Sequence, residues 1–156
     1  MEIKNIIKIL LIVVWMGVIF TFSSQNGKTS LGLSKNIIIK VAEFIKQEKL
    51  DPAEIEQITK KYIVIIRKGA HFFSYFVLAI FVYIFLKDYL QVKERLVFTT
   101  IFLCFLYAVT DEIHQLFSIG RTARVFDVFV DTLGAALSTV LLTLVSYIKN
   151  KCITKK

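Results

Sequence analysis

The chain has 156 residues, of which 56% are hydrophobic, and its mean hydropathy is +0.65. Soluble domains are nearer about 45–50% apolar, so the composition excludes an ordinary soluble globular protein. The formal net charge is +8, but no basic stripe carries the interleaved aromatic residues that are typical of nucleic-acid binding. The cations instead flank apolar runs, where anionic lipid headgroups would meet them. We therefore expect an all-α integral membrane protein whose partners include membrane lipids and no nucleic acid.

Four apolar runs are close to the length of about 20 residues that a transmembrane helix needs. They predict spans at approximately residues 6–22, 69–86, 96–112 and 126–148. We expect the first run to be retained rather than cleaved as a signal peptide, because no small-x-small cleavage site follows it. No internal repeat divides the chain, so residues 1–156 are interpreted as a single membrane domain.

Two amphipathic helices are expected between the first and second spans, at approximately residues 34–48 and 52–67. In the first, apolar residues recur at helical spacing and lysines occupy much of the remaining surface, which is typical of an interfacial helix. The second begins with a strong start signal, Asp51-Pro52, followed by Glu54. We expect it to end at residues 67–69, before the second span.

Four spans place both termini on the same side of the membrane. The short loop at residues 87–95 and the C-terminal tail on that side are rich in lysine and arginine. The positive-inside rule therefore predicts cytoplasmic termini.

Unusual polar residues stand at one end of every predicted span. Residues 23–25 close the first span, 68–71 open the second, 111–115 close the third and 121–131 open the fourth. Because successive spans alternate in direction, all four groups should meet on the outer side. Carboxylates at membrane depth are costly unless they are paired or hydrated, and ionisable residues there are functional candidates.

The residues in these groups suggest two sets of roles. Histidines and crowded carboxylates suit general acid–base catalysis, whereas cations and amides suit the binding of an anionic group. The catalytic candidates are His71, Glu112, His114, Asp127 and Asp131. The candidates for substrate binding are Ser24, Gln25, Lys68, Tyr75, Asp111, Gln115, Arg121 and Arg124. Gly134 and Ser138 continue the stripe of the two aspartates and would let another helix approach closely.

No cofactor is predicted from these residues. A divalent metal is disfavoured, because neither a His-x-x-Glu-His pattern nor a pair of cysteines at ligand spacing is present. Cys104 lies in an apolar run and Cys152 in the basic tail, so they do not form a disulfide framework.

Four motifs in order resemble the VanZ-like family of small bacterial membrane proteins. They are Phe22-Ser23-Ser24-Gln25; Lys68-x-x-His71-Phe72-x-x-Tyr75; Asp111-Glu112-x-His114-Gln115; and Gly120-Arg121 with Asp127-x-x-x-Asp131-x-x-Gly134. Asp131 is a departure, since many relatives have Asn there. The family's founding member is associated with resistance to the glycopeptide teicoplanin. The resemblance thus implies a bacterial cytoplasmic membrane and a cell-envelope role linked to antibiotic resistance.

The leading interpretation is an outward-facing polar pocket that acts on, or binds, a lipid-linked envelope precursor or a lipoglycopeptide. One alternative is a membrane scaffold in which the same residues form a structural ion-pair network. Another is an ion- or proton-coupled transporter. The sequence does not decide whether the protein is an enzyme, and it makes no prediction of oligomeric state.

Overall fold

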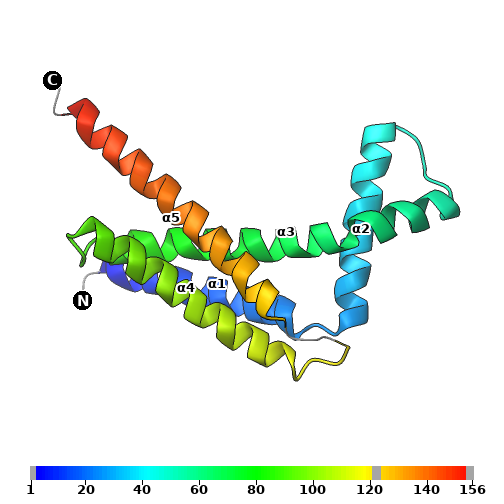
Figure 1. The fold of residues 1–156 in the computed structure, drawn as a ribbon, viewed down its shortest axis with the longest axis horizontal. Coiled ribbons are helices and arrows are strands. Elements are labelled where there is room, and N and C mark those ends of the chain that lie inside the picture. The colour runs from blue at the N-terminus through cyan, green and yellow to red at the C-terminus, as the bar shows by residue number, and fades with distance from the viewer. Residues whose placement is uncertain (1–2, 121–123, 154–156) are drawn as a thin grey trace.

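The computed structural model describes residues 3–120 and 124–153, and within them it is all-helical (Figure 1). The elements are α1 (Ile3–Ser24), α2 (Gly27–Lys46), α3 (Pro52–Leu86), α4 (Lys93–Gln115) and α5 (Val125–Ile153). Four of them, α1, α3, α4 and α5, are long and apolar enough to cross a membrane. The expected all-α membrane bundle is therefore confirmed.

The four long helices pack around an apolar core, and a set of buried polar residues also lies between them. The helices α1 and α4 lie along α3, and α5 crosses α3 obliquely (Figure 1). Many large apolar side chains on the outer surfaces of these helices are exposed, as expected of residues that face lipid rather than water. The buried core consists of Ile19, Tyr75, Leu78, Ala79, Val82, Cys104, Ala108 and Ala135.

The close contact between α3 and α5 depends on Gly134. A Cβ atom at this position would lie 2.2 Å from the backbone oxygen of Phe72. Ser138, one turn further along α5, is also buried. The small-residue stripe thus allows the two backbones to approach, as the sequence predicted.

The helix α2 runs across the direction of the bundle near one of its ends (Figure 1). Asn26 caps its N-terminus by accepting a hydrogen bond from the Thr29 backbone N–H at 2.8 Å. Its last residue, Lys46, donates a hydrogen bond to Glu54 in α3, and this contact raises the pKa of Lys46. Exposed apolar residues on α2 leave it suited to the membrane interface.

The boundary expected at residues 67–69 is absent, because α3 continues without a break from Pro52 to Leu86. Asp51 and Glu54 form the predicted capping box at its start. Gly69 does not interrupt the helix, since a single glycine costs only about 1 kcal/mol there. At about 1.5 Å per residue the helix is roughly 50 Å long, which exceeds the hydrocarbon thickness of about 30 Å. The N-terminal part of α3 must therefore extend beyond the hydrocarbon.

The bundle has two ends with different residues. The site end is the end where Ser23, His71, Asp111 and Asp131 lie. The far end is where α1 begins and α5 ends, and there Lys8 of α1 forms a salt bridge with Asp88, which follows α3 (Figure 1).

Candidate functional site

Two acids of α5 face two bases of α3 at the site end. Lys68 Nζ lies 2.7 Å from Asp127 Oδ1, and both side chains are about one-quarter exposed. One turn deeper, His71 Nδ1 lies 3.6 Å from Asp131 Oδ1, and Asp131 is completely buried. The spacing of four residues in α5 and three in α3 aligns the two pairs on facing sides of the helices.

Asp111 of α4 is a second buried acid at the site end, and a residue of α1 helps to hold it. Its Oδ2 atom accepts a hydrogen bond from Ser23 Oγ at 2.8 Å and from Gln115 Nε2 at 3.3 Å. The side chains of Ser23, Asp111 and Gln115 are all buried. Contacts from two helices therefore fix the direction in which this carboxylate points.

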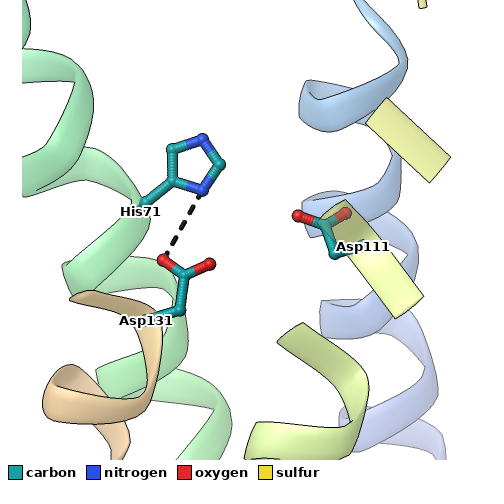
Figure 2. Close-up of side chains that lie close together, drawn as sticks. All are labelled: His71, Asp111 and Asp131. Atoms are coloured by element: carbon teal, nitrogen blue, oxygen red, sulfur yellow. Dashed lines mark ion pairs between the residues drawn. The ribbon is translucent and has the colours of Figure 1, made fainter. Parts of the chain in front are cut away.

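His71, Asp111 and Asp131 converge from three helices on one point (Figure 2). One ligand-type atom from each lies within 4.8 Å of the other two. Figure 2 shows the His71 ring and the Asp131 carboxylate turned toward each other, with the Asp111 carboxylate facing them across a gap. We call these three residues the buried triad after its two buried aspartates, while the side chain of His71 is 25% exposed.

The carboxylate oxygens of the triad are incompletely satisfied within the described residues. Both oxygens of Asp131 and Oδ1 of Asp111 are buried and make no hydrogen bond. Buried polar atoms almost always have a partner, and each exception calls for an explanation such as an ion, a water or a catalytic role.

Two cavities adjoin the triad, and they differ in character. The first has a volume of about 280 Å³, and its polar lining comprises Arg67, Lys68, His71, Gln115, Arg124 and Asp127. The second, of about 360 Å³, lies between α1, α2 and α3 and has a mainly apolar lining that includes Phe22, Leu33, Ile37, Ile66 and Phe73. Arg67 and His71 line both. A polar compartment and an apolar one thus share a wall, which is the arrangement that an amphiphile requires.

Two other predicted site residues, His114 and Tyr75, lie outside the walls of the two cavities. His114 contacts Ser24 Oγ through Nε2 at 3.0 Å and stacks on Phe20, with ring centroids 4.2 Å apart. Tyr75 is fully buried, its ring packs against Tyr107, and it lies close enough to Asp111 and Asp131 to interact with them electrostatically. The sequence placed both residues with the others because it gives depth in the membrane but only an approximate facing.

The remaining candidates are near the cavities. Glu112 is buried, and its Oε2 atom accepts a hydrogen bond from the backbone N–H of Arg124 at 2.9 Å. This contact ties α4 to the start of α5. Gln25 lines the apolar cavity. Arg121 lies outside the described residues.

Arg67 is a cavity residue that the sequence interpretation missed. It stands four residues before His71, so helical periodicity places it on the same face, and this signal could have revealed it. The contribution of α2 was also missed, because Ser30 and Ser34 line the apolar cavity although this segment was interpreted only as an interfacial helix.

A family model described as VanZ/LLP1 matches residues 8–146 of the chain. The chain belongs to this family. The matched region contains the buried triad and every residue named above for the two cavities. No curated protein and no solved structure matches the chain significantly. The family and the four apolar helices together indicate a VanZ-like multi-pass membrane protein.

Proposed function

We propose that this VanZ-like protein binds the anionic headgroup of a lipid-linked cell-envelope compound in the polar cavity, with part of the lipid chain in the apolar cavity. The observation that carries the proposal is the shared wall formed by Arg67 and His71. A headgroup beside Arg67, Lys68 and Arg124 would meet three cationic side chains. Charge-assisted hydrogen bonds of this type are about twice as strong as neutral ones.

The size of the cavities restricts the ligand. A volume of about 280 Å³ falls just below the range of about 300–1,000 Å³ that is usual for small-molecule pockets. It suits a phosphate-bearing headgroup, not a whole glycopeptide. A link with teicoplanin resistance would therefore be indirect, through an envelope lipid that the protein binds or processes.

The proposal also includes a membrane orientation. With cytoplasmic termini in the bacterial cytoplasmic membrane, the site end faces the outer leaflet. This orientation rests on the lysine-rich short loop and tail. The cavity would then take its ligand from the outer leaflet, where envelope precursors are consumed.

Two alternatives remain distinguishable. In a scaffold, the pairs Lys68–Asp127 and His71–Asp131 would serve only to join α3 to α5. A scaffold would have no need of the two cavities beside these pairs. A transporter would need a polar track to the far end, yet toward that end the buried hydroxyls of Thr100 and Thr139 each donate a hydrogen bond within their own helix, and their neighbours in the core are mostly apolar. Both observations favour binding at the site end.

The test uses the full chain in nanodiscs of zwitterionic lipid containing either a polyprenyl phosphate or the uncharged polyprenol, with binding measured by native mass spectrometry. We expect selective retention of the phosphate. Replacement of Arg67 by Gln should weaken binding by about 10–100-fold, which corresponds to one charged hydrogen bond of about 1.5–3 kcal/mol.

Lys60→Gln is the matched control, because Lys60 is an exposed cation on the same helix that lines neither cavity. It removes the same charge and should leave binding within about twofold. Equal binding of the phosphate and the alcohol, or equal loss in the two variants, would contradict the proposal.

A further inference from the structure

Among residues 3–120 and 124–153, the ion pairs leave the two carboxylates of the buried triad with only the His71 imidazole as a charged partner. The triad contains two carboxylates and one imidazole, and it lies where ionised groups are expensive to bury. Lys68, a nearby cation, is engaged with Asp127 instead. Among the described residues, the ion-pair contact of Asp131 is with His71 at 3.6 Å, which is longer than a hydrogen bond. Something further should balance this charge.

The three carboxylate oxygens without hydrogen bonds are an independent indication that a cation balances this charge. Asp131 is 0% exposed and Asp111 is 2% exposed, and the oxygens without hydrogen bonds belong to the two carboxylates that face each other in Figure 2. Ser23 and Gln115 occupy the opposite oxygen of Asp111. Outer contacts that fix a carboxylate while leaving its inner oxygen available are typical of metal ligands.

We propose that His71, Asp111 and Asp131 bind a divalent first-row transition-metal ion. One nitrogen and two carboxylate oxygens form a ligand set that Mn²⁺ and Zn²⁺ both accept, whereas Mg²⁺ and Ca²⁺ prefer oxygen alone. Ligand bonds of about 2.1 Å place tetrahedral ligand atoms about 3.4 Å apart. The present separations of up to 4.8 Å would shorten by up to about 1.4 Å when the ion binds.

The position of the triad beside the polar cavity indicates the role of the ion. His71 and Gln115 line the polar cavity, so a metal at the triad lies at its inner wall. Three protein ligands leave at least one coordination position open, as in catalytic rather than structural metal sites. An anionic oxygen in the cavity could occupy it. This last step rests on the proposed headgroup function, whereas metal binding itself does not.

The metal site explains why no metal motif is present in the sequence. Its three ligands come from α3, α4 and α5, at positions separated by 40 and 20 residues. No local spacing can encode such a set. The expectation that a metal is disfavoured depended on local motifs alone.

The first experiment measures Mn²⁺ and Zn²⁺ binding to the chelator-treated full chain in detergent, purified with a tag that contains no histidine. We expect one ion per chain for each metal, with Mg²⁺ at least about tenfold weaker. Pulsed electron paramagnetic resonance of the Mn²⁺ form should detect a directly coordinated imidazole nitrogen. This readout uses the wild-type protein and so does not depend on any variant folding.

The variants follow from the ligand assignment. Asp131→Asn and His71→Asn should each weaken metal binding by at least about 10–100-fold, the loss that even an outer-shell change causes. Ser23→Ala, which removes a positioning residue of Asp111, should weaken it by about tenfold. The chain has only two histidines, so His114→Asn is the matched control and should retain binding and the nitrogen signal.

The outcomes separate the two proposals. Absence of Mn²⁺ and Zn²⁺ binding at millimolar concentration, or a nitrogen signal that survives in His71→Asn, overturns the metal site. Because these titrations contain no polyprenyl phosphate, they do not depend on headgroup binding. Metal binding without lipid selectivity would support the metal site and reject the headgroup proposal. Lipid selectivity without metal binding would support the headgroup proposal and reject the metal site.

Discussion

The two ends of the bundle place their charges differently. At the far end the ion pair between Lys8 and Asp88 lies at the surface, with side chains that are 24% and 39% exposed. At the site end, Asp111, Glu112 and Asp131 are each at most 4% exposed. A surface pair is worth about 0–1 kcal/mol and loses little hydration, whereas a buried acid incurs a large desolvation cost. The comparison supports the proposal that the acids at the site end serve binding or chemistry, because burying them is costly for stability.

The largest expected effect tests the packing between α3 and α5, which are two of the three helices that carry the triad. Gly134→Leu places a side chain where even a Cβ atom would lie 2.2 Å from the Phe72 carbonyl oxygen. We expect a loss of at least about 3 kcal/mol, at or beyond the upper end of ordinary overpacking, because the obstacle is backbone. Thermal unfolding can be followed with a thiol-reactive dye on buried Cys104 in a Cys152→Ser background.

Gly69→Ala is the control for this change, since a Cβ atom at Gly69 meets nothing within 4 Å. It lies within α3 and should stabilise the protein by about 0.5–1 kcal/mol. If both substitutions shifted the unfolding temperature in the same direction, the close approach of α3 and α5 would not be the cause.

The second prediction concerns the buried aspartate of α5. In chelator-treated protein, Asp131→Asn should raise stability by about 1–2 kcal/mol, because it removes a buried charge whose oxygens make no hydrogen bond. That corresponds to roughly 2–8 °C in Tm for a chain of this size. The gain should diminish when Mn²⁺ is added, since only the wild-type triad would bind it tightly. A lower Tm in the metal-free variant would instead support the structural ion-pair network.

The smallest effect is expected at the far end. Lys8→Ala removes the partner of Asp88 at the surface and should reduce stability by less than about 1 kcal/mol. Polyprenyl phosphate binding should not change, because the pair is remote from both cavities. A large loss of either property would show that the two ends are coupled, and it would weaken the contrast drawn above.

Helical periodicity placed Lys68 and His71 on one face of α3, and Asp127 and Asp131 on one face of α5, but it did not say which residues would pair. The structure pairs Lys68 with Asp127 and His71 with Asp131. His114 shares the predicted face with Asp111 yet contacts Ser24 and Phe20. One helical turn offers several residues at the same depth, and only the packing of neighbouring helices selects which one turns inward.

The sequence by itself determined the helical class, the four apolar helices long enough to cross a membrane and the gathering of polar residues at one end of them, because hydrophobic run length and alternation of direction are properties of the chain. Tertiary structure alone decided that α3 continues unbroken through Gly69. It also decided that Arg67 and α2 line the cavities, and that one histidine and two aspartates from three helices converge. The physical reason is that convergence depends on how helices rotate about their axes when they pack, and the close contact at Gly134 fixes that rotation between α3 and α5.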